Sequence, residues 1–239
     1  MSRKICCAIV LMLLCLTPNS YAQGSLEWIL RTNAGIGTDY QTLAYDNPNS
    51  SGNLYYSAGG GFGVEGGIGY LPIEALETYA TVALQKNLAA QVVSSNYGSY
   101  KSTFSFGRTT LNVGSNYIYR FPKKHDIGIK LGGGANFNSP GEMRLTEENT
   151  DFGKATFHPS IGFHLEAGFV FVWGNWTLMP TLRYRNIHFE LDQHAVKSIP
   201  TSNRDSYNAY LDYIQNLDVS GVDLSLTLRR RMDNRETNP

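Results

Sequence analysis

Residues 157–173, FHPSIGFHLEAGFVFVW, alternate between apolar and polar side chains over most of their length. The odd positions are all apolar, whereas the even positions include His158, Ser160, His164 and Glu166. Because successive side chains in a β-strand point to opposite faces, this pattern predicts a strand with one hydrocarbon face and one polar face. A fold built from such strands must place one face against an apolar phase.

Seven other stretches show the same period of two, so the sequence predicts eight strands. The predicted strands are Glu27–Tyr40, Tyr55–Leu71, Leu76–Ala89, Thr103–Phe121, Asp126–Phe137, Phe157–Trp173, Trp176–Leu191 and Val219–Met232. The chain contains 24 glycines, many of them within these stretches.

The connections between these strands alternate between long polar loops and short turns. The short turns are Pro72–Ala75, Pro122–His125 and Gly174-Asn175, and the long loops are Gln41–Leu54, Ala90–Ser102, Asn138–Thr156 and Asp192–Asp218. This order is typical of an antiparallel up-and-down β-barrel, which places its loops on one rim and its turns on the other. We therefore expect an all-β fold with eight strands.

The apolar face carries aromatic side chains where strands meet the short turns. These are Trp28, Tyr70, Tyr119, Phe121, Trp173 and Trp176. Aromatic girdles at this level are typical of transmembrane barrels, whose apolar face meets lipid. A soluble lipocalin-like carrier, with its apolar face inside, is the alternative that strand phase alone leaves open.

The polar face would then line the interior, where we predict a network of charged side chains. Its members are Arg31, Glu65, Glu77, Arg108, Lys130, His164, Glu166, Arg183, Arg185, Asp223 and Arg229. An eight-stranded barrel has room inside for side chains only. Buried charges are costly unless paired, so we expect the four carboxylates of this set to balance its arginines.

The first 22 residues have the pattern of a signal peptide. Arg3 and Lys4 precede an apolar run, and a small-x-small site ends at Ala22. All three cysteines of the chain lie in this segment. We therefore expect an exported protein without disulfides, with residues 1–22 removed, a barrel over 23–232 and a tail over 233–239. The near balance of charge in the rest of the chain gives no indication of nucleic-acid binding.

The segment Gly59–Pro72, GGGFGVEGGIGYLP, together with the signal peptide and the eight strands, resembles the small outer-membrane barrels related to OmpA, OmpX and OmpW. The resemblance implies a transmembrane barrel with short periplasmic turns and long extracellular loops. It also implies a monomer in the outer membrane of a Gram-negative bacterium, in contact with outer-membrane lipid and lipopolysaccharide. A fold of this kind does not by itself specify a function.

His158-Pro159-Ser160 is similar to the His-x-Ser of outer-membrane lipid A deacylases. Such a serine needs a base that is oriented by a carboxylate, and Glu166 lies roughly 20 Å along the strand from Ser160. His164, next to Glu166, lacks the further ligands of a zinc site. We therefore predict no catalytic residue, no metal site and no cofactor, and expect that the protein is not an enzyme.

Two local features complete the predictions. Residues 206–218, SYNAYLDYIQNLD, have apolar side chains at helical spacing behind a serine, which predicts a short helix or an exposed recognition surface containing Tyr207, Tyr210 and Tyr213. Pro180 lies within the seventh predicted strand, and because proline cannot donate a ladder hydrogen bond we expect a bulge there.

The function favoured by these features is that of a non-enzymatic surface barrel with a filled, charge-paired interior. It would act through its loops in envelope integrity, adhesion or host contact, with an extracellular or host-surface partner. The alternatives are a pore for small solutes, a membrane-embedded lipid A esterase and a soluble lipocalin-like carrier.

Overall fold

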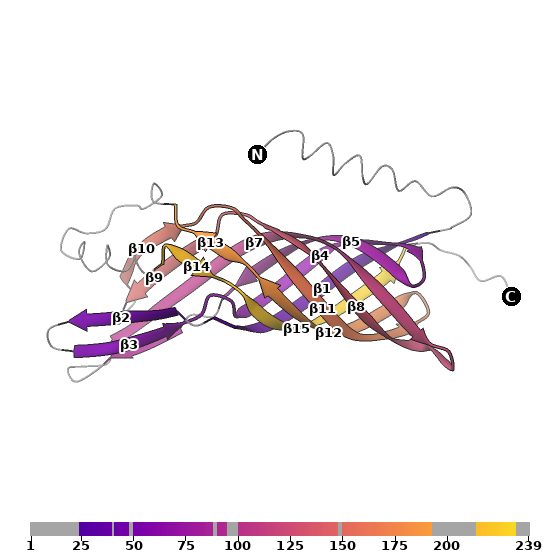
Figure 1. Cartoon of the computed structure of the whole chain (residues 1–239), viewed down its shortest axis with the longest axis horizontal. Helices are drawn as coiled ribbons and strands as arrows, with labels where there is room; N and C mark the ends of the chain where they lie inside the picture. Colours follow the sequence, from indigo (N-terminus) through magenta and orange to yellow (C-terminus); the bar gives the residue numbers. More distant parts are fainter. Residues whose placement is uncertain are drawn as a thin grey trace, which may run out of the picture.

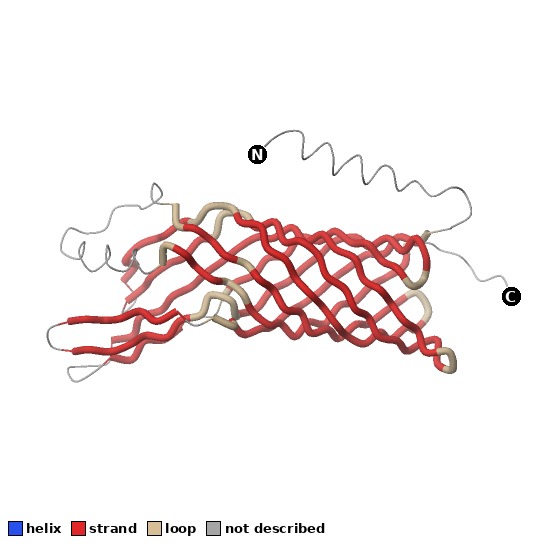
Figure 2. The backbone as a smooth tube through the Cα atoms, viewed as in Figure 1, coloured by secondary structure: helices blue, strands red, loops and turns tan. Residues whose placement is uncertain are grey.

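The computed structural model describes residues 24–39, 41–47, 50–87, 90–94, 100–147, 150–192 and 214–232. Strands dominate these ranges, as the tube in Figure 2 shows. The predicted signal peptide and the tail after residue 232 lie outside them.

Eight strands form a closed antiparallel ring. The ring strands are β1 (Ser25–Gly37), β4 (Gly61–Ile73), β5 (Leu76–Lys86), β7 (Tyr100–Phe121), β8 (Lys124–Asn138), β11 (Ser160–Trp173), β12 (Trp176–Asn186) and β15 (Gly221–Arg231). Each pairs with the next in chain order, and β15 closes the ring by pairing with β1. The predicted all-β, eight-stranded up-and-down barrel is therefore confirmed.

The two rims of the barrel differ as predicted. β1 starts and β15 ends at the rim with the short turns, at the right of Figure 1. The turns after β4 and β11 fall at Glu74-Ala75 and Gly174-Asn175, and Gly174 has a φ of 56°, which glycine adopts without strain. At the other rim, which we call the long-loop end, several strands continue beyond the barrel.

The long connections contain more strand than predicted. They hold β2 (Gln41–Asn47), β3 (Ser50–Tyr56), β6 (Ala90–Ser94), β9 (Glu142–Glu147), β10 (Thr150–Thr156), β13 (His188–Glu190) and β14 (Asn216–Asp218). β2 pairs with β3, β6 and β9 pair with the first residues of β7, and β13 pairs with β14. β6, β13 and β14 have only three to five residues, and β2 and β3 mix polar and apolar residues, so none of them was recognised as a strand. β9 does alternate, with Met143 and Leu145 between polar residues, and this signal was missed.

The outer wall of the barrel is a belt of exposed apolar side chains. Leu30, Val82, Leu131, Leu165 and Leu224 are each 50–68% exposed, although they occupy the middle of long strands. The predicted aromatic residues lie on the same outer face, with Trp28 60% exposed. A water-soluble protein rarely exposes a continuous apolar surface of this extent, whereas a membrane barrel requires one.

No helix in the described ranges is long and apolar enough to cross a membrane.

The alternation of residues 157–173 changes phase near its start. Ile161, Phe163 and Leu165 face outward as predicted, but Phe157 is 1% exposed and lies inside the long-loop end. The strand β11 begins only at Ser160, after His158 and Pro159, which belong to no strand. The prediction that Phe157 shares the outer face was therefore wrong, because the break at Pro159 shifts the phase by one residue.

Pro180 does not cause the predicted bulge. Its neighbours keep one register against β15, with Met179 opposite Thr227 and Thr181 opposite Ser225. On the other side, the ladder with β11 omits the pairs between Gly168↔Thr181 and Phe171↔Leu178 without a register shift. The missing N–H is thus accommodated by interrupting the ladder, rather than by inserting an extra residue.

The helix predicted over residues 206–218 is not present in its described part. Asn216–Asp218 form β14, and Ile214 and Leu217 are buried. Tyr207, Tyr210 and Tyr213 lie outside the described residues. Asn216–Asp218 pair with β13, and this tertiary contact determines the local structure in place of the helical spacing of the apolar residues.

Candidate functional site: the barrel interior

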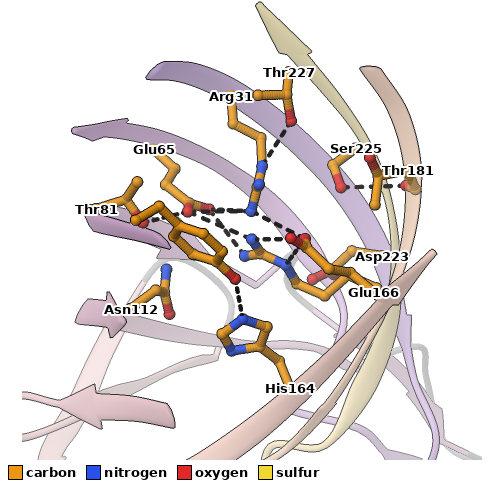
Figure 3. Close-up of polar contacts among 12 residues, drawn as sticks. Arg31, Glu65, Thr81, Asn112, His164, Glu166, Thr181, Asp223, Ser225 and Thr227 are labelled. Carbon is orange, nitrogen blue, oxygen red and sulfur yellow. Dashed lines mark hydrogen bonds and ion pairs between the residues drawn. The ribbon is translucent and has the colours of Figure 1, made fainter. Parts of the chain in front are cut away.

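The interior of the barrel is lined by the charged side chains that the sequence placed on the polar face. All eleven are at most 7% exposed. They are Arg31, Glu65, Glu77, Arg108, Lys130, His164, Glu166, Arg183, Arg185, Asp223 and Arg229. Figure 3 shows the middle of this network, with side chains from several strands converging.

Two carboxylates hold the centre of the network. Glu65 on β4 accepts hydrogen bonds from Arg31 Nη1 at 3.2 Å and from Arg183 Nη1 at 2.9 Å. Glu166 on β11 lies 3.2 Å from Lys130 Nζ, 3.3 Å from Arg183 Nε and 3.5 Å from Arg31 Nη1. Three cations thus share two carboxylates in a region without solvent exposure, where each charge needs its partners to offset the cost of desolvation.

These contacts join strands that are not neighbours in the ring. Glu65 and Arg183 are separated on the wall by β1 and β15, and Arg31 and Glu166 by β15 and β12. The side chains therefore cross the interior from wall to wall. This is possible because an eight-stranded barrel is narrow enough for long charged side chains from opposite walls to meet.

A directional chain of hydrogen bonds lies beside the ion pairs. Tyr79 Oη lies 2.5 Å from His164 Nε2, and His164 Nδ1 lies 3.3 Å from Asn136 Oδ1. Asn136 in turn donates to Asn112 Oδ1 at 2.5 Å. With Nδ1–H donating and Nε2 accepting, a neutral imidazole satisfies both contacts. The chain holds His164 in place and leaves it no free nitrogen for a metal.

Two uncharged residues, Thr81 and Thr227, belong to the network although they were not among its predicted members. Thr81 Oγ1 donates to Glu65 Oε1 at 2.5 Å, and Arg31 Nε donates to Thr227 Oγ1 at 2.7 Å. Their inward phase was visible in the alternation. Their pairing was not, because alternation identifies a face but not the height at which a side chain reaches its partner.

A second group of charges lies toward the short turns. Arg229 forms an ion pair with Glu77 and lies 3.8 Å from Glu27 Oε2. Asn116 Nδ2 donates to the other oxygen of Glu77 at 2.7 Å. Glu27, at the start of a predicted strand, was not among the predicted network residues, yet it is 3% exposed.

A third group lies toward the long-loop end. Arg185 makes a two-point contact with Asp223, with Nε at 2.5 Å and Nη2 at 2.8 Å, and also donates to the Gly59 carbonyl. Arg108 differs from expectation, because Nη2 donates to Gln85 Oε1 at 2.7 Å instead of pairing with a carboxylate. Gln85 lies directly opposite Arg108 on the neighbouring strand, which brings the two side chains within hydrogen-bond distance.

Glycines make room for these side chains on the inner wall. A Cβ at Gly35 would lie 2.1 Å from Asp223 Oδ1, and one at Gly132 would lie 2.0 Å from Asn116 Oδ1. Both glycines face these residues directly across a strand pair. The long polar side chains therefore pack against the backbone of glycines, and these large and small residues together fill the interior.

An apolar cluster occupies the long-loop end above the charges. Its members are Ala58, Phe106, Met143, Ala155, Phe157, Ile187, Phe189, Leu191, Ile214, Leu217 and Val219. Phe106 packs edge-to-face on Phe157 and Phe189, with ring centroids 5.8 Å and 5.4 Å away. Segments from β7, β9, β10, β13 and β14 meet in this cluster, which we call the apolar cap.

His158 and Ser160 do not form a nucleophilic pair in this arrangement. His158 is exposed at the rim, whereas Ser160 Oγ accepts a hydrogen bond from Asn138 Nδ2 at 3.2 Å. Both residues line one pocket, but in the described part of the chain no hydrogen bond joins their side chains. Among the described residues, no group of three or more His, Cys, Asp or Glu side chains is placed to hold a metal ion.

Comparison with solved structures returned several membrane barrels of low similarity. Neisserial surface protein A shares 15% identity, over 86% of this chain and 97% of its own, with a TM-score of 0.46. A major outer membrane protein from Thermus thermophilus shares 12%, over 87% of this chain and 100% of its own, with a TM-score of 0.49. The attachment invasion locus protein Ail of Yersinia pestis shares 9%, over 87% of this chain and 99% of its own, with a TM-score of 0.42.

No protein-family model matches the chain, and no curated protein matches it. The fold assignment therefore rests on the strand pairing itself. The closed ring of eight antiparallel strands, the apolar belt outside and the charged interior define a small transmembrane β-barrel, the class that the sequence resemblance indicated.

Proposed function

We propose that this protein is a non-enzymatic, non-conducting barrel of the Gram-negative outer membrane that acts through its long-loop surface. The observation that carries the proposal is the set of ion pairs that cross the interior, with Glu65 and Glu166 each bound by cations from other walls. A solute on the barrel axis would have to displace these pairs. Breaking a buried pair costs about 3–5 kcal/mol, so the pairs form a barrier to conduction.

The apolar cap supports the same conclusion from the other side of the network. Phe106, Phe157 and Phe189 are at most 2% exposed and pack at the long-loop end, so an ion entering there would meet hydrocarbon before it reached a charge. Transfer of an ion into such surroundings is costly. The ion-pair network and the apolar cap thus both oppose conduction, the first because its ion pairs would have to break and the second because an ion would lose its hydration.

If the interior does not conduct, specific interactions belong to the rim and the loops. Loops on a rigid scaffold are common sites of recognition, because the scaffold fixes their ends while their sequences vary. The strands β2, β3, β9 and β10 extend beyond the barrel on this side (Figure 1) and give the long loops a base of regular structure. We propose that this end faces outside the cell and contacts an extracellular partner or neighbouring envelope components.

The closed interior is tested by electrical recording on the protein refolded in planar lipid bilayers. Flotation of proteoliposomes and a gel-mobility shift between unheated and boiled samples would first establish insertion. We expect a current that stays at the baseline of the protein-free bilayer over the full voltage range. Reproducible conductance steps from inserted protein would support the solute pore instead.

The role of the loops is tested separately, on cells that display the protein. Tyr207, Tyr210 and Tyr213 would be replaced together by alanine, and attachment of the cells to coated surfaces would be compared with that of cells carrying the unchanged protein. We expect attachment to fall while the gel-mobility shift remains. Equal attachment of both strains would remove the tyrosines from the recognition surface and leave the closed barrel intact.

A further inference from the structure

The outer wall of the barrel has a groove where β4, β5, β7 and β9 lie side by side at the long-loop end. It has a volume of about 790 Å³. Its lower wall is apolar, formed by Phe62, Val64 and Leu84, each of which is more than half exposed. Its upper wall includes the charged side chains of Lys86 and Arg144.

The strand register explains this change from apolar to charged. Val64 lies opposite Leu84, and one pair further toward the loops Phe62 lies opposite Lys86. On the next strands Ser105 lies opposite Arg144, which itself lies opposite Lys154. Because directly opposed residues share a face, these rows form a ladder on the outer wall that leads from the apolar belt to a basic patch.

The floor of the groove is formed by a glycine. Gly107 lies between Lys86 on β5 and Glu142 on β9 in the same row. A Cβ at this position would meet only the Gln85 carbonyl oxygen, at 3.9 Å, so no side chain of the protein fills the space. This differs from the interior glycines, whose Cβ positions are occupied by neighbouring atoms.

The charges of the groove favour an anion. Lys86 is exposed and, among the described residues, makes no hydrogen bond or ion pair. Arg144 Nε lies 2.8 Å from Glu142 Oε1, and Lys154 forms an ion pair with the same carboxylate. Arg144 and Lys154 thus share Glu142, and Lys86, in the same row across Gly107, adds a positive charge of its own next to a hydrophobic surface.

We propose that this groove binds a lipid with a phosphorylated headgroup from the surrounding leaflet. The phosphate would lie between Lys86 and Arg144 over Gly107, and the acyl chains would run down over Phe62, Val64 and Leu84. Arginine and lysine are the usual partners of phosphate, and long basic side chains at the edge of an apolar belt reach toward headgroups. This inference rests on the membrane orientation in the proposed function.

A lipid fits the groove better than a soluble anion because the apolar wall continues into the belt. Val82 and Leu111 extend it away from the loops and are 50% and 44% exposed. Hydrocarbon chains would be covered along this whole path. A free phosphate would use only the upper wall, where Glu142 opposes it.

Native mass spectrometry of the refolded mature chain tests the proposal. The protein in detergent is titrated with dimyristoyl phosphatidic acid, and in parallel with dimyristoyl phosphatidylcholine, whose headgroup has no net charge. We expect the phosphatidic acid to bind about tenfold more tightly. The preference should fall to about twofold in Lys86→Gln and should be retained in Lys86→Arg.

Two further variants distinguish the shape of the groove, and the position of the lysine, from the effect of positive charge alone. Gly107→Phe fills the groove without changing its charge and should weaken phosphatidic acid binding about tenfold. Lys123→Gln, at the turn on the opposite rim, removes the same charge elsewhere and should change nothing. Every variant must first show the gel-mobility shift of the folded barrel.

The outcomes distinguish this inference from the proposed function. A preference that survives both Lys86→Gln and Gly107→Phe would overturn the lipid site while leaving the closed barrel untouched. Removal of the preference by millimolar inorganic phosphate alone would identify an anion site that does not need acyl chains, which also contradicts the proposal. Failure of the unchanged protein to show the gel-mobility shift would instead count against the membrane barrel.

Discussion

Arg183 on β12 and Glu65 on β4 meet inside the barrel, with Arg183 Nη1 2.9 Å from Glu65 Oε2, although 118 residues separate them in the chain. The wall between them consists of β1 and β15. Glu65 also binds Arg31, which links the contact to the rest of the network. The pair therefore links two strands across the interior, and these strands can approach this closely only when the ring is closed.

Removing one carboxylate from the centre should destabilise the barrel strongly. Glu166→Gln keeps the size of the side chain but leaves Arg31 and Arg183 with Glu65 alone, and leaves Lys130 without an ion pair among the described residues. Loss of one partner of a buried pair typically costs about 3–5 kcal/mol. We expect a decrease of this size in the free energy of unfolding, measured by urea titration in lipid vesicles.

The matched control is Glu142→Gln, which removes a carboxylate from a solvent-accessible ion pair. Its partners Arg144 and Lys154 are about half exposed. Exposed pairs contribute about 0–1 kcal/mol, so this variant should unfold almost as the unchanged protein does. Equal losses in the two variants would mean that the interior charges are hydrated.

The orientation of the faces predicts a contrast between two other substitutions. Leu131 is 58% exposed on the outer belt, whereas Ser225 is 3% exposed in the interior and donates to the Thr181 carbonyl. Leu131→Arg places a charge in lipid and should cost about 2–4 kcal/mol. Ser225→Ala loses one hydrogen bond and should cost about 1 kcal/mol. The reverse order of unfolding midpoints would contradict the assigned phase.

The glycines of the inner and outer walls should respond differently to a methyl group. Gly132→Ala puts its Cβ 2.0 Å from Asn116 Oδ1 and 2.4 Å from the Ser115 carbonyl, which is backbone and cannot move cheaply. Overpacking of this kind typically costs about 1–3 kcal/mol. The Cβ of Gly107→Ala would make only an ordinary contact with the Gln85 carbonyl oxygen at 3.9 Å, so its unfolding free energy should be unchanged or slightly higher. Similar thermal unfolding of both variants would show that the interior is loosely packed.

The pH dependence of stability can be predicted at the long-loop end, outside the membrane-spanning part. The hydrogen bond from Lys154, with a further one from Arg144, holds the pKa of Glu142 below its ordinary value of 4.5. Since the folded state lowers this pKa, the contribution to stability is present above pH 4.5 and is lost as pH falls through the folded value.

The side chain of Glu142 is about a third exposed, which limits the effect to less than about 1 kcal/mol at low salt. The difference in unfolding free energy between the unchanged protein and Glu142→Gln should be constant from neutral pH to pH 5 and shrink below pH 4.5. A difference that grows on acidification would contradict the sign of this shift.

The strand order and the faces could be predicted from the sequence because each ring strand has one side in contact with lipid and one in the interior. Apolar outer residues such as Leu131 and polar inner residues such as Glu166 therefore alternate along their strands, and the period of two predicts which face each occupies. The hairpin of β2 and β3 lacks this contrast. β2 and β3 carry polar residues on both faces, so nothing in their sequences distinguished them from irregular loop.

The partners inside the barrel could not be predicted from the same pattern. Alternation places Arg108 in the interior, but it does not show that Gln85 lies opposite Arg108 while Glu65 lies near Arg183. Those pairs depend on strand register and on the tilt of the barrel, which bring distant residues to one height. The break at Pro159 shows the limit most clearly, because the two residues outside the strand, His158 and Pro159, place Phe157 in the apolar cap instead of on the predicted outer face.

The outward direction of the apolar face is the claim on which the whole account depends, and tryptophan fluorescence tests it directly. The chain has three tryptophans, and Trp28, Trp173 and Trp176 are 60%, 49% and 37% exposed on the outer face near the short turns. The protein would be refolded into vesicles whose acyl chains carry bromine at defined depths. We predict strong quenching, greatest for bromines near the headgroups, as expected for an interfacial girdle. Fluorescence that bromine leaves unchanged, from a protein that stays monomeric without lipid, would mean that the tryptophans point inward and that the protein is a soluble barrel.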